Sequence, residues 1–311
     1  MSGAPGRFGS VVTAMVTPFG GDGALDVDGC VALARWLTAN GSDGLVLAGT
    51  TGESPTLTDD EKAELWRSVA EAVTVPVIAG ATSNDTAHSV ELTKRAVSCG
   101  VAAILAVTPY YSRPSQAGLA GHFRAVAAAT RLPVVLYDIP VRTGRKIGND
   151  TLLELARDTP NIVGVKDAAG DPSASAQLIA EAPAGFELYS GDDAMTLPLL
   201  AVGAVGVISV AAHWAGTVIA EMIESFAKGD VDRARGHNAR LLESWTFQTG
   251  DLAPNPVPTK AMLRSMGLPA GECRLPLGPT PAGLEEKAAG VLSRLGVPVP
   301  STAAGAGGTR A

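Results

Sequence analysis

Residues 161–170 read NIVGVKDAAG. Ile162, Val163 and Val165 are β-branched residues of the kind that favours a strand buried on both faces. Lys166 then stands where another aliphatic side chain would be expected. The stretch therefore predicts an interior strand of a parallel sheet, and this strand ends in an amine.

Short runs of the same kind recur through the first three quarters of the chain. They lie roughly 20 to 35 residues apart, and the intervals between them have helical patterns, which indicates βα units and a parallel sheet. The eight runs are SVVTAMVTP (10–18), DGLVLAG (43–49), VPVIAG (75–80), AAILAVTP (102–109), LPVVLYDIP (132–140), IVGVKD (162–167), FELYSGDD (186–193) and VGVISV (205–210). We predict an α/β fold in which they close into a (β/α)8 TIM barrel.

Helix boundaries are readable in two of the intervals. Thr58 precedes an acidic first turn with Glu61 at the third helical position, which is the pattern of a capping box. Asp85 or Thr86 can cap the next helix, and Gly100 follows its end. Both segments are predicted to be amphipathic helices that cover the barrel.

After residue 210 the pattern changes to helices only. The segment 216–230 can complete the last βα unit, and further helical patterns follow it. We predict a barrel over residues 1–230 that carries the active site, and a C-terminal helical domain over residues 231–311. Its end, from about residue 298, is rich in Pro, Gly and Ala and is predicted to be mobile.

Charge and motif content exclude several classes of function. The formal net charge is −7 and no cluster of Lys and Arg appears, so we expect no nucleic-acid partner and no membrane surface. No apolar run is long enough to span a membrane and the first residues lack an apolar core, so we expect a cytoplasmic protein. The four histidines lack metal-ligand spacing, and no Walker A, G-x-G-x-x-G or G-x-S-x-G sequence occurs. We expect no metal.

In a barrel of this type, the site forms at the carboxyl ends of the strands. Lys166 would project into an apolar mouth, where desolvation lowers the pKa of its amine, and a neutral amine can form a Schiff base with a ketone. Tyr137 ends the neighbouring strand and could move protons beside that amine. The alternatives are a lysine that pairs with Asp167 at the rim and a tyrosine that fills the core.

Two loops offer groups suited to carboxylates. The turn GTTGE, residues 49–53, carries the hydroxyls of Thr50 and Thr51 and exposed backbone N–H groups. Arg142 stands in the loop after the fifth run, where a guanidinium can hold a carboxylate bidentately. An ordinary turn and a solvated arginine are the alternatives at these positions.

Taken in order, five motifs resemble those of the dihydrodipicolinate synthase and N-acetylneuraminate lyase family of class I aldolase-type barrels, from about residue 11 to residue 295. The motifs are GTTGES, TPYY, YDIPVRTG, GVKDAAG and SGDDA followed by GVISV. The synthases match best, because they typically carry the double threonine and the arginine found here as Thr50, Thr51 and Arg142. The resemblance implies that pyruvate condenses on Lys166 and that the enamine attacks aspartate semialdehyde to give hydroxytetrahydrodipicolinate, with no cofactor.

The resemblance also implies roles for individual residues. Tyr137, Thr50 and Tyr111 would form a proton relay, with Tyr111 supplied by a neighbouring subunit of a homotetramer built as a dimer of dimers. Thr51 would bind the pyruvate carboxylate and Arg142 the carboxylate of the semialdehyde. The backbone near two further residues would line the pocket; these are Gly191 and Ile208.

The chain departs from the family pattern in places. Asp138 and Asp167 follow the tyrosine and the lysine, where many synthases have Asn and Glu. At a possible regulatory site Asn84 and Tyr110 are retained. Where some relatives have histidines and a glutamate, this chain has Asp59, Lys62 and His88, so we expect no strong inhibition by lysine. Two other functions stay open at this point: a sialic-acid lyase or keto-deoxy sugar-acid aldolase of the same barrel, and a non-catalytic barrel that binds a keto acid.

Overall fold

The structure is a computed structural model that describes residues 6–250 and 253–297. The segment from residue 298, predicted above to be mobile, lies outside the described residues. Within them, no helix combines the length and the apolar character needed to cross a membrane.

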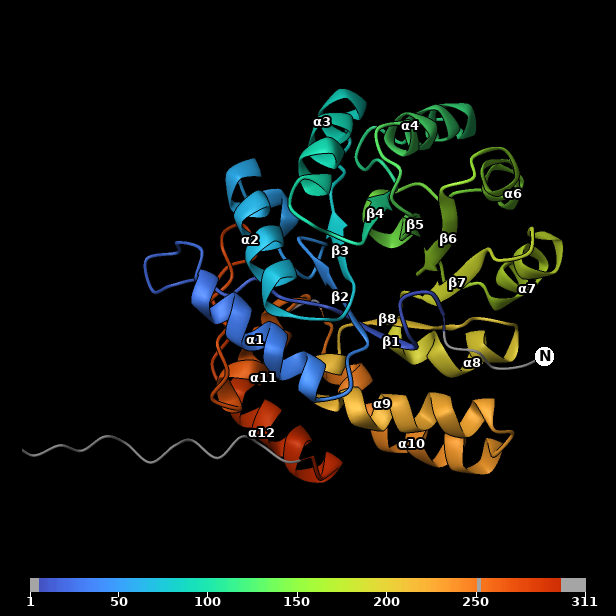
Figure 1. Cartoon of the computed structure of the whole chain (residues 1–311). Helices are drawn as coiled ribbons and strands as arrows, with labels where there is room; N and C mark the ends of the chain where they lie inside the picture. Colours follow the sequence, from blue (N-terminus) through green and yellow to red (C-terminus); the bar gives the residue numbers. More distant parts are fainter. Residues whose placement is uncertain (1–5, 251–252, 298–311) are drawn as a thin grey trace, which may run out of the picture.

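Eight parallel strands close into a barrel in the order of the chain, β1 to β8 (Figure 1). The strands are β1 (Val11–Ala14), β2 (Gly44–Leu47), β3 (Val77–Gly80), β4 (Ala103–Val107), β5 (Val134–Asp138), β6 (Ile162–Asp167), β7 (Glu187–Ser190) and β8 (Gly206–Ser209). Every one of them lies within a run identified from the sequence. The prediction of an eightfold barrel is confirmed.

Helices surround the ring on its outside (Figure 1). They are α1 (Val27–Ala39), α2 (Asp59–Ala72), α3 (Thr86–Val97), α4 (Gln116–Ala128), α6 (Asn149–Asp158), α7 (Pro172–Glu181), α8 (Thr196–Ala201) and α9 (Ala212–Ala227). The short helix α5 (Pro140–Thr143) follows β5 directly, and 3-10 turns occur at Ser54–Thr56 and Asp193–Met195. The capping box of Thr58 and Glu61 is present at the start of α2. At the start of α3 the cap is Asp85, whose carboxylate accepts from two backbone N–H groups.

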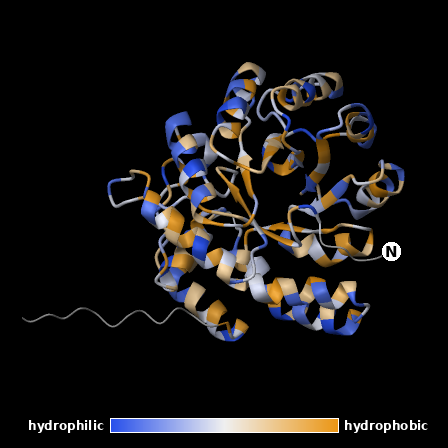
Figure 2. Cartoon of the chain, in the orientation of Figure 1, coloured by the Kyte–Doolittle hydropathy of each residue, from blue (hydrophilic) through white to orange (hydrophobic). Residues whose placement is uncertain are grey.

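Apolar side chains fill two layers. Inside the ring, residues from several strands form one buried cluster, which includes Val46, Ile78, Tyr137 and Ile208. A larger cluster lies between the strands and the outer helices, and much of the strand ribbon at the centre of Figure 2 is accordingly orange. The interior of the barrel is therefore a packed core, so a side chain at a strand end is held at a defined position.

Three further helices follow the barrel: α10 (Val231–Phe247), α11 (Val257–Ser265) and α12 (Leu284–Leu295). Helix α10 runs beside α9 (Figure 1), and Trp214 of α9 meets Phe247 of α10 edge to face. Apolar residues of α9, α10, α11 and α12 share one buried cluster. The predicted C-terminal helical extension is thus present and packs against the barrel's last helix.

Candidate active site

The register of β5 and β6 places two of the candidate residues side by side. Tyr137 pairs with Lys166, and the next pair along the strands is Asp138 with Asp167. Because successive strand residues point to opposite faces, each pair occupies its own face of the barrel wall. The ammonium nitrogen of Lys166 lies 4.2 Å from the centre of the Tyr137 ring. Lys166 and Tyr137 are therefore neighbours, with the nitrogen over the face of the ring.

Lys166 is buried, with only 5% of its surface exposed. Burial lowers the pKa of its amine to about 7; the charge of Asp193 opposes this shift, and that of Arg142 adds to it. At neutral pH a large share of the amine is therefore uncharged. This is the state in which an amine attacks a carbonyl carbon.

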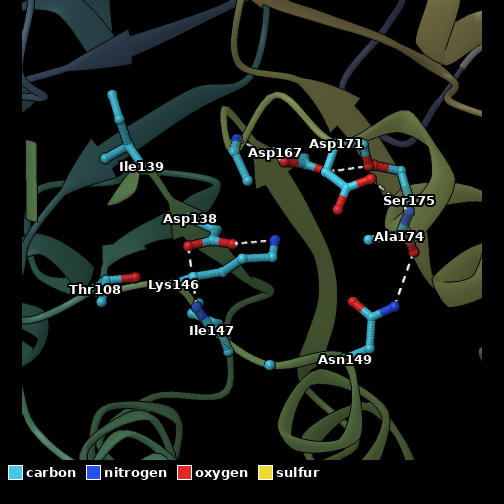
Figure 3. Close-up of polar contacts among 12 residues, drawn as sticks. Thr108, Asp138, Ile139, Lys146, Ile147, Asn149, Asp167, Asp171, Ala174 and Ser175 are labelled. Atoms are coloured by element: carbon cyan, nitrogen blue, oxygen red, sulfur yellow. Dashed lines mark hydrogen bonds and ion pairs between the residues drawn. The ribbon is translucent and has the colours of Figure 1, made fainter. Parts of the chain in front are cut away.

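The alternative of a lysine paired with Asp167 does not occur. One oxygen of the Asp167 carboxylate accepts from the backbone N–H of Ala169 at 2.9 Å, and the other accepts from the Ser175 hydroxyl at 2.5 Å (Figure 3). In the described ranges, Lys166 makes no ion pair with any carboxylate. Its charge is thus left without a direct partner.

Asp138, on the same outer face as Asp167, is also occupied. Its carboxylate accepts from the Lys146 ammonium at 3.1 Å and from the backbone N–H of Ile147 at 3.1 Å (Figure 3). Burial raises the pKa of Asp138, while these two donors lower it. The two aspartates thus tie the strand ends to the following loops, and both face away from the amine.

A cavity of about 420 Å³ opens at the carboxyl ends of the strands. Five of the residues selected from the sequence line it: Thr50, Tyr110, Tyr111, Tyr137 and Arg142. Burial raises the pKa of Tyr137 to about 12, against the effects of the Arg142 charge and a hydrogen bond with Thr50. The phenol is therefore protonated at neutral pH and able to donate.

Three other candidates, Gly191, Ile208 and Thr51, are not among the described residues that line this cavity. A Cβ atom on Gly191 would stand 3.0 Å from Cγ of Lys166, so the absence of a side chain leaves room for the lysine. Ile208 is buried in the same interior cluster as Tyr137. Thr51 is buried and accepts a hydrogen bond at 3.0 Å from the side-chain amide of Asn255.

Tyr111 differs from the other cavity residues in its exposure. In this single chain 91% of its surface is accessible, and its backbone is left-handed with φ of 73°. That conformation is costly for a bulky residue and is concentrated at functional sites. Tyr111 thus lines the cavity of its own chain while most of its surface stays accessible.

The possible regulatory residues differ in their surroundings. Tyr110 lines the cavity just described, whereas Asn84 is exposed and His88 is held by other groups. The ring of His88 contacts the carboxylate of Asp59 at 2.8 Å and the hydroxyl of Ser83 at 3.3 Å. In this chain the imidazole therefore already has partners on both nitrogens.

Sequence reasoning missed two groups at this site. Asp193 supplies the carboxylate charge that acts on Lys166, and Ser209 and two backbone N–H groups donate to it. Its signal was the sequence SGDD at the end of the seventh run. Asn255 had no local signal, because it comes from the C-terminal extension and meets Thr51 only in three dimensions.

Comparisons with known proteins agree with this geometry. The model of the dihydrodipicolinate synthetase family matches residues 7–294. A 4-hydroxy-tetrahydrodipicolinate synthase of Moorella thermoacetica is 49% identical, covering 94% of this chain and 99% of the relative. A crystal structure of dihydrodipicolinate synthase from Cyanidioschyzon merolae with lysine bound superposes with a TM-score of 0.90 at 43% identity, covering 94% and 99% of the two chains. A structure described as the first monomeric dihydrodipicolinate synthase variant has a TM-score of 0.88 at 35% identity, with 93% and 97% covered.

Proposed function

Because the chain belongs to the dihydrodipicolinate synthetase family, we propose that it condenses pyruvate with L-aspartate 4-semialdehyde on Lys166. The product is 4-hydroxy-tetrahydrodipicolinate, which opens the route to lysine and diaminopimelate. The observation that carries this proposal is the buried amine beside the Tyr137 phenol, with a pKa of about 7. It supports a lysine that forms a Schiff base.

The covalent steps follow from a neutral amine. The Lys166 nitrogen attacks the carbonyl carbon of pyruvate, and the carbinolamine loses water to leave an iminium ion. Loss of a methyl proton then gives an enamine, whose carbon attacks the aldehyde of the second substrate. The amino group of that substrate attacks the imine carbon, which closes the ring and releases the lysine. Tyr137, Thr50 and the Tyr111 of a neighbouring subunit carry the protons.

Substrate carboxylates are held by separate groups. Thr51 and the turn around it bind the carboxylate of pyruvate through hydroxyl and backbone donors. Arg142, which stands at the cavity, binds the carboxylate of the semialdehyde with its guanidinium. Gly191 and Ile208 complete the pocket around the lysine.

The barrel up to residue 230 carries the chemistry, and the helices from residue 231 support it. From the family likeness we infer a cytoplasmic homotetramer made of two dimers, in which Tyr111 acting across the dimer makes at least the dimer obligatory. Its 91% exposure in one chain supports a role on a partner surface. Mass measurement in solution tests the assembly, and a fully active monomer would contradict it.

The proposal for the possible regulatory residues is weak binding of lysine. Asn84, His88 and Tyr110 form at most a weak lysine site, because His88 is engaged by Asp59 and Ser83. A lysine titration of the activity tests this. Potent inhibition would overturn it.

A pair of assays decides the reaction. Pyruvate with aspartate semialdehyde is expected to give product, whereas N-acetylneuraminate and 2-keto-3-deoxy sugar acids are not cleaved. Arg142→Ala should raise KM for the semialdehyde by about 10- to 100-fold, the loss typical of a hydrogen-bonded charge. Cleavage of a sugar acid with no turnover of the semialdehyde would replace this function by that of an aldolase.

A further inference from the structure

Asn255 lies in the C-terminal extension, between α10 and α11, yet it contacts both proposed carboxylate-binding residues. Its side-chain nitrogen Nδ2 donates to Thr51 Oγ1 at 3.0 Å. Its backbone oxygen accepts from Nη2 of Arg142 at 3.4 Å. Its side-chain oxygen Oδ1 accepts from the Thr259 hydroxyl at 3.2 Å. Only 9% of Asn255 is exposed, so these contacts are shielded from water.

We propose that Asn255 is a positioning residue for pyruvate, acting through the direction of the Thr51 hydroxyl. A hydroxyl has one hydrogen and two acceptor lone pairs. When Asn255 fills a lone pair of Thr51 Oγ1, the hydrogen is left to bond an oxygen of the pyruvate carboxylate. This inference rests on the proposed function, because it assigns to Thr51 the carboxylate of that substrate.

The orientation of the amide is set by Thr259. That hydroxyl occupies Oδ1, and the amide nitrogen therefore faces Thr51. Turning the amide over would present Oδ1 to Thr51, which would then have to donate its hydrogen to Asn255 instead of to the substrate. Thr259 is fully buried on the first turns of α11, which keeps this anchor in place.

The helix that holds Asn255 is itself fixed to the loop of Thr51. Lys260, next to Thr259 in α11, forms an ion pair with Glu53 at 2.6 Å, and both side chains are inaccessible to solvent. The other oxygen of Glu53 accepts from the backbone N–H of Arg274 at 2.8 Å. The extension is therefore bound to the turn at Glu53, two residues after Thr51. This attachment keeps the Asn255 amide at hydrogen-bonding distance from the Thr51 hydroxyl.

The two contacts of Asn255 use different atoms, so they can be separated. Replacing the side chain removes the bond to Thr51 but leaves the backbone oxygen that accepts from Arg142. We therefore expect a change at Asn255 to affect pyruvate and to spare the semialdehyde. A merely structural role would affect both substrates and lower thermal stability in proportion.

The test measures trapping of pyruvate by borohydride at increasing pyruvate concentration, together with steady-state kinetics. Asn255→Leu keeps the size of the side chain and should raise the half-saturating pyruvate concentration about tenfold, the cost of misdirecting one hydrogen bond to a charged group. KM for the semialdehyde and kcat should stay within about twofold. Asn255→Asp should be worse for pyruvate than Asn255→Leu, because its carboxylate accepts the Thr51 hydrogen and repels the substrate anion.

A double-mutant cycle shows whether the effect passes through Thr51. Thr51→Val alone should also raise the pyruvate requirement, and Asn255→Leu added to it should change little, because the hydroxyl is already gone. Thr259→Val is the companion variant on α11, which removes only the anchor of the Asn255 amide. It should raise the pyruvate requirement less than Asn255→Leu does. If the effects of Thr51→Val and Asn255→Leu on the pyruvate requirement multiply in the double variant, this inference is overturned. An unchanged pyruvate requirement in both Asn255 variants would also overturn it, and neither result would touch the proposed function. A wild-type chain that traps no pyruvate would instead overturn the proposed function.

Discussion

Among the described residues Lys62, Lys166 and Lys260 are buried, and the last two differ in their surroundings in one respect. Lys260, with no exposed surface, lies 2.6 Å from the Glu53 carboxylate and donates to the backbone oxygen of Glu272 at 3.0 Å. Lys166 makes no ion pair within the described residues. Each nitrogen lies over an aromatic ring, at 4.1 Å for Phe19 and 4.2 Å for Tyr137. Burial and an aromatic neighbour are thus common to both.

The comparison teaches that burial alone does not make a nucleophile. Desolvation lowers the pKa of both amines, but at Lys260 the charge of Glu53 and a hydrogen bond to it work against that shift. At Lys166 only the more distant charge of Asp193 does so. Lys260 is therefore held as a member of an ion pair, whereas Lys166 has the properties expected of the reactive amine that we propose.

The largest effect is expected from removing the reactive amine. Lys166→Met should lower turnover by about 1,000-fold or more and abolish trapping of pyruvate, because no other group can form the covalent intermediate. The melting temperature should stay equal or rise, since an unpaired buried amine is replaced by an apolar side chain of similar length. Kinetics and calorimetry on the same sample check both parts, and a large drop in melting temperature would make Lys166 a structural residue.

Tyr137→Phe should have the next largest effect. It gives Lys166 the same kind of aromatic neighbour that Lys260 has in Phe19, a ring without a hydroxyl. Loss of the hydroxyl removes proton transfer and should reduce kcat by about 100- to 10,000-fold. The ring stays in place over Lys166, so slow trapping of pyruvate should persist. Rapid-quench trapping measures this, and wild-type kcat in the variant would remove Tyr137 from the relay.

Removing the ion pair of Lys260 should lower the stability of the fold. Lys260→Met leaves Glu53 buried without its partner and should lower the free energy of unfolding by about 3–5 kcal/mol. Denaturant unfolding gives this number.

The matched control for that variant is the double substitution Lys260→Met with Glu53→Gln. Removal of the orphaned charge should restore part of the lost stability, because a neutral amide costs less to bury than a carboxylate. If Lys260→Met unfolds with wild-type stability, the ion pair contributes nothing to stability. The contrast between a structural Lys260 and a reactive Lys166 would then fail at Lys260.

The smallest effect is a shift in pH dependence. With a pKa of about 7 for Lys166, the trapping rate should fall about tenfold per pH unit below that value and level off above it, because only the neutral amine reacts. Asp193→Asn removes the charge that raises this pKa, so its profile should move to lower pH. Arg142→Ala should move it to higher pH. Stopped trapping reactions across pH give the three midpoints, and coincident midpoints would show that neither charge acts on the amine.

Local patterns were enough to predict the barrel, and the resemblance of the strand-end motifs to a known family pointed to most of the candidate site. Each strand lies inside a run rich in apolar residues, and the parallel order of neighbouring strands brings Tyr137 to Lys166. The motifs of the loops at the strand ends identified Thr50, Tyr111 and Arg142 as cavity residues. These features depend on short segments and on a repeated topology, which a sequence displays directly.

The supporting contacts were not predictable in the same way. Lys260 stands in a helical pattern where a lysine reads as a surface residue, and its partner Glu53 is more than 200 positions away. Asn255 likewise reaches Thr51 from the far end of the chain. Such pairs depend on how the extension docks on the barrel, and no local periodicity encodes that contact.

The most direct test of the two-lysine account is peptide mass spectrometry after borohydride reduction of the wild-type protein with pyruvate. We predict one modified residue, Lys166, carrying the mass of a single reduced pyruvate, while Lys260 stays unmodified. An adduct on Lys260 or on any other lysine, or an unmodified Lys166 in a folded protein, would contradict the account.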